Sequence, residues 1–452
     1  MRQLRINPRV LGESSRRTVS RMRSVLLALV LPSLAAAQTA LGPSAGLVRW
    51  AKANAIPMRP VDEPYADSAY DFLRALVGQA SVLSLGELMH GAHEPLEFRN
   101  HAIEYAVTKL GFTAVAIESG LTEGIVVDRF VQGGAGNIDS VMSNGFTNGF
   151  GRLGENRELV LWLREHNARN DRKVHFYGID VPGAIGGYTA APRTPRAALD
   201  YLERVAPSVA RGLRADLDSL LDRFTSAGFL KYSGAEREQL RRGLDGLEAA
   251  LLADSSRYIR ATSPIDYTRA VRIAWNAQRL HDTFIVGGPM GPRALEAIRL
   301  RDSVMFENAK WVLAQQGSGG RLVVFAHNGH SMNVPLVFPA MGPPMVMLGQ
   351  RLRSWLGPRM VAIGTATGKS EGLPPRPSDM STFETTLGQL GLSNYALDLR
   401  TGDASPEIAA MLRAPWLTWI HSWFQPIVPR DVADMFVVFD HVTASKDHFP
   451  PR

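Results

Sequence analysis

The stretch "SVLSLGELMHGAH", from Ser81 to His93, joins a mainly apolar run to a cluster of ionisable side chains. Residues 82–85 have the length and composition of a buried strand, and Gly86 ends the run. Glu87, His90 and His93 follow within seven positions. Whether they form a solvated loop or part of a functional site depends on what the other strands of the chain carry at their ends.

Five further segments have the same character as this strand. They cover residues 113–118, 173–179, 321–326, 359–364 and 435–439. Helical periodicity occupies residues 66–78, 95–110, 155–169 and 294–316. Because strands that alternate with helices pack as a parallel sheet with covered faces, we predict an α/β fold with a mostly parallel central sheet flanked by helices.

A long helical block separates the third core strand from the fourth. Between residues 194 and 285 the composition is dominated by Ala, Leu, Arg and Glu, and strand signals are absent. We interpret this block, together with the helix that follows it to about residue 316, as a helical insertion or cap. Residues 38–452 are therefore predicted to form one domain that contains this insertion.

The N-terminus has the pattern of a secretory signal peptide. Seven arginines precede a 14-residue, mainly apolar segment that ends in Ala35-Ala36-Ala37, so residues 1–37 are predicted to be cleaved and the protein to be exported, periplasmic or secreted. That segment is shorter than the roughly 20 residues that span a bilayer, so no stable membrane span is expected after cleavage. Cleavage would leave 43 basic and 42 acidic residues, which gives no reason to expect a nucleic-acid partner.

Ionisable side chains follow each of the first four core strands. Glu87 and His90 follow the first strand, Glu118 ends the second, and Asp180 and His327 follow the third and fourth. Because the carboxyl ends of parallel strands meet at one edge of the sheet, we expect these groups to share a site there.

Simpler structural roles remain open for several of these residues. Glu118 would be partly buried, and a salt bridge with Arg99 would satisfy it. Glu94 stands just before Pro95 and is favoured by the dipole of the helix that begins there, and Asp180 is placed to initiate a turn.

The same residues allow two kinds of chemistry. Glu87, His90 and His93, with His327 and His330, supply enough ligands for zinc, and the chain has no Cys that could take part. Their spacing is not that of a HExxH helix, so we favour a site without a metal. There His90 would remove a proton from water while Glu87 or Glu118 holds its tautomer.

Five motifs in this order resemble those of the erythromycin esterase family. They are LGELMHGAHE (residues 85–94), Arg99, GFTAVAIE (111–118), FYGID (176–180) and AHNGH (326–330). The resemblance covers about residues 60 to 445. It implies an esterase that opens the lactone ring of macrolide antibiotics. The resemblance leaves metal dependence open, and on the spacing argument above no cofactor is expected.

The resemblance also implies roles for individual residues. His90 would be the general base that activates water, and Glu87 and Glu118 would orient His90 or the water. Arg99 would hold the carboxylates or stabilise developing negative charge, and His327 would polarise the carbonyl oxygen or protonate the leaving alkoxide.

Three further residues, His93, His330 and Asp180, are assigned to substrate binding. The expected partner is a small-molecule ester, and the sequence leaves the oligomeric state open. Two alternatives are kept: a ligand-binding protein of the cell envelope without catalytic activity, and a metal-dependent hydrolase of another ester or of a polysaccharide substituent.

Overall fold

The computed structural model describes residues 44–181, 191–287, 293–337, 343–370, 382–420 and 423–447. The predicted signal peptide lies outside these residues. Within them, no helix combines the length and the apolar character needed to cross a membrane.

An eight-stranded sheet forms the centre of the protein, in the order β1-β7-β10-β6-β2-β5-β3-β4. Six neighbouring strands, from β10 to β4, are parallel, and β7 and β1 continue the sheet in antiparallel fashion. The strands are β1 (Ile56–Pro57), β2 (Val82–Glu87), β3 (Ala114–Gly120), β4 (His175–Asp180), β5 (Leu322–His327), β6 (Met360–Ser370), β7 (Asn394–Asp398) and β10 (Met435–Val442). The predicted mostly parallel α/β sheet is confirmed.

Helices cover both faces of the sheet, and further helices pack at its ends. The α-helices are α2 (Ala45–Asn54), α3 (Phe72–Val77), α4 (His93–Leu110), α5 (Leu121–Val131), α6 (Ile138–Asn144), α7 (Gly154–Arg169), α14 (Ala294–Gln315), α15 (Asn328–Ser331), α16 (Leu348–Leu356), α17 (Phe383–Gly388), α18 (Pro406–Leu412) and α19 (Pro429–Val432). Short 3-10 helices are η1 (Asp67–Tyr70), η2 (Phe150–Arg152), η3 (Gly357–Arg359) and η4 (Leu399–Ala404), and a separate hairpin is formed by β8 (Trp416–Ile420) and β9 (Trp423–Ile427).

Alternation along the central strands explains the two covered faces. Leu83, Val115 and Val323 point into the core beneath α4 and α7, whereas their chain neighbours Val82 and Val324 point into the core beneath α14 and α16. These strands are fully buried, so every strand position is available to hydrophobic packing.

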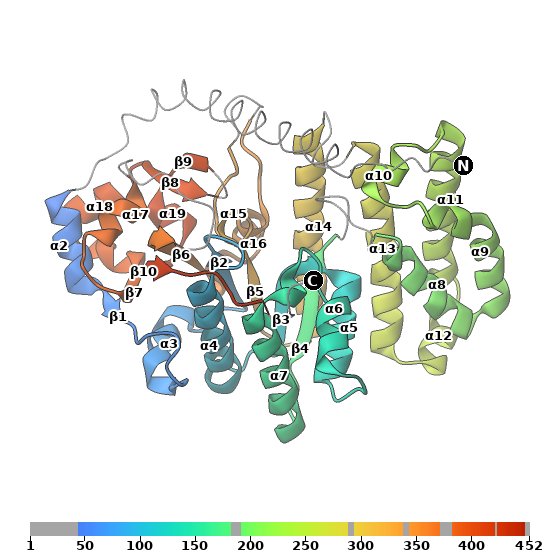
Figure 1. Cartoon of the computed structure of the whole chain (residues 1–452), viewed down its shortest axis with the longest axis horizontal. Coiled ribbons are helices and arrows are strands. Elements are labelled where there is room, and N and C mark those ends of the chain that lie inside the picture. Colours follow the sequence, from blue (N-terminus) through green and yellow to red (C-terminus); the bar gives the residue numbers. More distant parts are fainter. Residues whose placement is uncertain are drawn as a thin grey trace, which may run out of the picture.

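The predicted helical block at residues 194–285 is present as six helices, whereas α14, which the prediction counted with it, packs against the sheet. The six helices are α8 (Arg193–Val205), α9 (Pro207–Leu221), α10 (Ser226–Phe229), α11 (Gly234–Leu252), α12 (Ser255–Ala261) and α13 (Pro264–Ile285). Figure 1 shows them at one end of the molecule, with α14 between them and the sheet. They have a hydrophobic core of their own, and α14 contacts both α13 and the strands β3, β4 and β5. The helix α14 thus links the insertion to the edge of the sheet where the candidate residues lie.

Candidate active site

The carboxyl ends of β2, β3, β4 and β5 bring the predicted side chains to one edge of the sheet. Glu87 at the end of β2 pairs in register with His327 at the end of β5. Glu118 and Asp180 lie near the ends of the neighbouring strands β3 and β4. All four residues are buried. The sequence therefore placed these groups correctly on the fold.

His90 and Glu87 form a hydrogen-bonded pair at this edge. The bond joins Nδ1 of His90 to Oε1 of Glu87, whose side chain is only 2% exposed. Because an ionised carboxylate can only accept, Nδ1 carries the hydrogen and Nε2 is the nitrogen that can take up a proton. Glu87, rather than Glu118, is therefore the carboxylate that fixes the tautomer of His90. The other oxygen of Glu87, Oε2, is buried and has no hydrogen-bond partner among the described residues.

The ring of His90 is accessible although it lies deep among protein atoms. Its side chain is 44% exposed, and the rings of Phe150 and His327 each have their centroid 5.2 Å from the centroid of the His90 ring. Burial lowers the pKa of His90, but the charge and hydrogen bond of Glu87, together with the charge of Glu118, raise it to about 9. His90 is thus a basic imidazole that solvent can reach, and it is mainly protonated at neutral pH.

Glu118 is paired with Arg301, not with Arg99. Nη2 of Arg301, from α14, donates to Oε1 of Glu118 at 2.7 Å, and the same guanidinium donates to both oxygens of Asp180 at 2.7–3.1 Å. Arg99 instead donates to the side chains of Asn100 and Asn156, at 2.8–3.1 Å. The expected Arg99–Glu118 salt bridge is therefore wrong, because Glu118 is paired with Arg301 of α14, which is remote in sequence.

Arg99 nevertheless lies close to the candidate site. Its guanidinium carbon stands 4.6 Å from the centroid of the Phe325 ring, and it is completely buried. Burial lowers its pKa to about 10, and the charge of Glu87 acts in the opposite direction. Its role toward the substrate stays a prediction.

His330 belongs to the network around Arg301. Its Nδ1 lies 2.6 Å from Oδ1 of Asp302, and its Nε2 lies 3.2 Å from Nη1 of Arg301. Arginine can only donate, so Nε2 accepts and Nδ1–H donates to the aspartate. The assignment of His330 and Asp180 to substrate binding stays untested, and the structure shows both of them bound to Arg301.

His327 uses both ring nitrogens for backbone groups. Nε2–H donates to the carbonyl oxygen of Leu88 at 3.0 Å, and Nδ1 accepts from the amide of Gly329 at 3.2 Å. Burial, reinforced by the nearby charge of His90, lowers its pKa to about 3, so the ring is neutral. The role implied by the resemblance would require the Leu88 bond to be exchanged for one to the substrate.

His93 lies in a separate cluster. Its Nδ1 is 2.6 Å from Glu155 and its Nε2 is 2.7 Å from Asp62. The hydrogen bond with Glu155 is the main reason that the pKa of His93 is raised to about 9. Among the described residues, His93, Glu97 and Glu155 are the group whose potential ligand atoms have metal-binding spacing, within 4.8 Å of one another. The zinc alternative that combined His93 with His90 and His327 does not match this arrangement.

Glu94 ties the loop that carries His90 to the end of the described chain. Its two oxygens accept from the amide of Thr443 at 2.7 Å and from the hydroxyl of Thr443 at 2.9 Å. The amide of Ser445 donates to the carbonyl oxygen of Gly91 at 2.8 Å. Glu94 does lie in the first turn of α4, as expected, but it also anchors residues 443–445 across residues 91–93.

Three functional candidates were missed in the sequence: Arg301, Asp302 and Phe150. Arg301 stands on a face of α14 shared with the buried residues Ala297, Met305 and Asn308. A charged residue at a buried position of a helix is the one signal that could have identified it.

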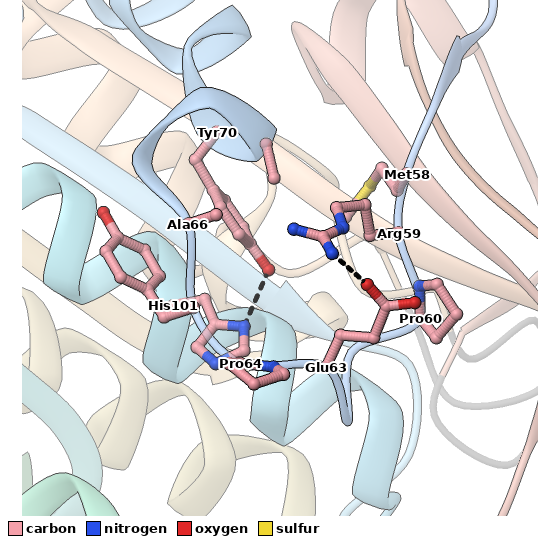
Figure 2. Close-up of a pocket in the computed structure, with 10 residues that line it drawn as sticks. Met58, Arg59, Pro60, Glu63, Pro64, Ala66, Tyr70 and His101 are labelled. Carbon is pink, nitrogen blue, oxygen red and sulfur yellow. Dashed lines mark hydrogen bonds and ion pairs between the residues drawn. The ribbon is translucent and has the colours of Figure 1, made fainter.

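A small pocket lies elsewhere on the protein (Figure 2). It is lined by Met58, Arg59, Pro60, Glu63, Pro64, Tyr65, Ala66, Ala69, Tyr70 and His101. Arg59 pairs with Glu63 across it, and the hydroxyl of Tyr70 lies 3.0 Å from Nδ1 of His101. None of the strand-end residues lines this pocket, so we place the candidate active site at His90, where the ionisable groups converge.

A parallel α/β sheet with an accessible histidine–carboxylate pair at its carboxyl edge defines a class of proteins suited to acid–base chemistry. Residues 107–441 match the model of the family described as Erythromycin esterase. The chain belongs to the erythromycin esterase family, which indicates a hydrolase that acts on ester bonds.

Two curated relatives come from Escherichia coli. Erythromycin esterase type II is 25% identical over 365 residues, which cover 75% of this chain and 82% of the relative. Erythromycin esterase type I is 23% identical over 314 residues, 65% of this chain and 72% of the relative.

Solved structures share the fold. A Bacillus cereus protein has a TM-score of 0.75 at 22% identity and covers 89% of this chain and 99% of its own. A structure described as a succinoglycan biosynthesis protein has a TM-score of 0.72 at 20% identity, with 89% and 98% covered. A histidine-to-asparagine mutant of erythromycin esterase EreC in its open conformation has a TM-score of 0.60 at 17% identity, with 88% and 100% covered. At these identities the likeness concerns the fold alone.

Proposed function

We propose that this chain is an exported hydrolase of bulky or cyclic carboxylic esters, with macrolide lactones as the leading substrate class, and that His90 activates water without a covalent intermediate. The observation that carries the mechanism is the Glu87–His90 pair, in which a buried carboxylate fixes the tautomer of an accessible imidazole. The names of the E. coli relatives support the substrate class.

The reaction can be written with its protons balanced. Nε2 of His90 takes a proton from water while the water oxygen bonds to the ester carbonyl carbon. Glu87 stays ionised, accepts the Nδ1–H bond and stabilises the imidazolium that forms. When the tetrahedral intermediate collapses, the carbon–alkoxy bond breaks and the Nε2 proton passes to the leaving oxygen. The products are a carboxylic acid and an alcohol, joined in one chain when the substrate is a lactone.

A hydrolysis screen tests this function. Wild-type protein, His90→Gln and a control variant, His166→Gln, are assayed with macrolides and simple esters. His166 lies on α7, stacked on Trp162. We expect wild type and His166→Gln to hydrolyse the same substrates and His90→Gln to lose at least about 10²-fold in kcat, the usual contribution of a general base. Full activity of His90→Gln would reject His90 as the base.

Labelled water tests the absence of a covalent intermediate. In a single turnover in H₂¹⁸O, direct attack by water places ¹⁸O in the product carboxylate and leaves the protein unlabelled. An acyl-protein trapped by rapid quenching would contradict direct attack. Ligand binding without any product across the whole panel would favour a ligand-binding protein instead.

Export is supported by the composition of residues 1–37. Expression of the full chain in a bacterial host, followed by N-terminal sequencing of the product, is expected to yield a mature protein that begins at Gln38. An intact N-terminus on cytoplasmic protein would reject this part of the proposal.

A further inference from the structure

Arg301 binds three of the ionisable groups at the strand ends at once. Its side chain is 3% exposed. Nε and Nη2 donate to Asp180, Nη2 also donates to Glu118, and Nη1 donates to Nε2 of His330 at 3.2 Å. The flat, five-donor guanidinium suits such a three-way contact, whereas a lysine ammonium supplies only a point charge.

Arg301 determines the charge of Glu118. Burial alone would raise the pKa of Glu118, but its surroundings hold it well below the usual range, and Arg301 is the permanently charged cation that touches the carboxylate. Each carboxylate oxygen has one firm partner: Oε1 accepts from Arg301 and Oε2 accepts from the amide of His327 at 2.9 Å. Glu118 is therefore held in one position in its ionised form, and its charge acts on His90.

Arg301 also determines the tautomer of His330. Because Nη1 of Arg301 donates to Nε2, the imidazole hydrogen stands on Nδ1 and points to Asp302. The charged and titratable groups around Glu118 come from five elements and one loop: Glu87 from β2, His90 from the loop after it, Asp180 from β4, His327 and His330 from β5 and α15, and Arg301 from α14. Of these, Arg301 is the one permanently charged cation.

We propose that Arg301 is a positioning residue of the active site, in that it keeps Glu118 ionised and His330 in a single tautomer, so that His90 works beside a fixed negative charge. This inference rests on the proposed ester hydrolysis. The inference adds Arg301, a residue of α14, to the active site. Catalysis then requires that α14 packs on the sheet as it does in this structure.

Two variants of Arg301 and one matched control test the inference. Arg301→Lys keeps a positive charge and loses the planar fork, whereas Arg301→Gln loses both. The control is Arg269→Lys: Arg269 is a buried arginine paired with Asp128, which contacts the start of β4 at the end opposite to Asp180. Thermal unfolding and near-UV circular dichroism establish that the variants are folded.

We expect Arg301→Gln to lose at least about 10²-fold in kcat, Arg301→Lys about tenfold, and Arg269→Lys less than threefold. If Arg301→Gln does not fold, the test by kcat rests on the comparison of Arg301→Lys with Arg269→Lys. Wild-type kcat in Arg301→Lys, or a loss no larger than that of the control, would overturn the inference.

Infrared spectroscopy supplies a measurement that needs no substrate. In wild type, Glu118 stays ionised because its pKa lies well below the usual range, and the ammonium of Arg301→Lys should keep it ionised. In Arg301→Gln, burial without this cation should raise the pKa of Glu118, so a protonated-carboxyl band appears at a pH where the wild type shows none. The band should vanish in the double variant Arg301→Gln/Glu118→Gln, which assigns it to Glu118 and not to Asp180.

The kinetic and infrared measurements distinguish failure of the inference from failure of the proposed function. If the wild type hydrolyses no ester, the proposed function fails, while the infrared band still shows whether Arg301 controls Glu118. Absence of the band in Arg301→Gln would overturn the inference, whatever the activity of the wild type.

Discussion

Replacement of Glu87 by Gln should change the pH dependence of turnover in a way that can be calculated. The variant removes a negative charge from the side chain that accepts the Nδ1–H bond of His90 and keeps its size and an acceptor oxygen. In the wild type, burial lowers the pKa of His90, yet Glu87 and Glu118 raise it from 6.5 to about 9. Without Glu87, its largest opposing influence is gone and the pKa returns to about 6.5 or below.

The sign follows from the role of His90 as a base. Only the neutral imidazole accepts a proton, so kcat/KM of the wild type rises tenfold per pH unit up to about pH 9 and then levels. The variant already levels near pH 6.5. The ratio of wild-type to variant kcat/KM should therefore grow by about 80-fold between pH 6.5 and pH 9, because each imidazole is half neutral at its own pKa.

Water reduces this figure, because the His90 side chain is 44% exposed and solvent screens part of its attraction to Glu87. Growth of the ratio by tenfold or more is the result that supports the reasoning. The assay is initial-rate hydrolysis of an ester identified in the screen, at constant ionic strength, from about pH 5.5 to about pH 10.

Glu155→Gln is the matched control. Glu155 is also a buried glutamate hydrogen-bonded to a histidine, His93, but it lies in the other cluster. Its pH profile should keep the wild-type midpoint. A constant ratio between wild type and Glu87→Gln across the range would show that the charge of Glu87 does not control the base.

Three further predictions concern stability and metal ions. Gly86→Ala should lower the free energy of unfolding by about 1–3 kcal/mol in urea and reduce kcat, because a Cβ there would lie 2.3 Å from Oδ1 of Asn328; unchanged stability would contradict the close approach. His93→Gln should destabilise the protein by about 2 kcal/mol below pH 6.5, and the difference should disappear as the pH rises through about 9, because the folded state raises the pKa of His93 beside Glu155; a pH-independent difference would count against this. Dialysis against EDTA should leave kcat unchanged, since Arg301 already binds the carboxylate oxygens at the strand ends; loss of activity that zinc restores would point to a metal-dependent hydrolase.

The parallel core and the residues at its strand ends could be predicted because each buried strand is apolar on both faces. Such a strand stands out as a short continuous run, and its carboxyl end is where polar residues resume. The strand β7, which lies between β10 and the two-residue edge strand β1, was not predicted. Its sequence, Asn394 to Asp398, is short and polar at both ends, so it forms a strand because its neighbours, mainly β10, supply its hydrogen bonds.

The network around Arg301 could not be predicted for a different reason. In α14 the sequence presents Arg299 and Arg301 two positions apart, and apart from the helical spacing that aligns Arg301 with Ala297 and Met305, nothing local distinguishes a solvated arginine from a buried one. The distinction arises when α14 packs on β3, β4 and β5, so that one arginine is buried against Glu118 and Asp180. Long-range packing, not local propensity, selects the partner of a buried carboxylate.

The position of His90 has a similar long-range cause at the opposite side of the site. The loop between β2 and α4 carries Gly91 in a left-handed conformation, at φ +76°. Its amide at Leu88 donates to Thr365 in β6 at 2.8 Å, and residues 91–94 are bound by residues 443–445 that follow β10. Since these contacts come from strands that lie on the same side of β2, and Arg301 acts from the other side, the catalytic pair is held between two parts of the fold that are distant in sequence. A change in either part should then alter kcat before it alters the affinity for a substrate.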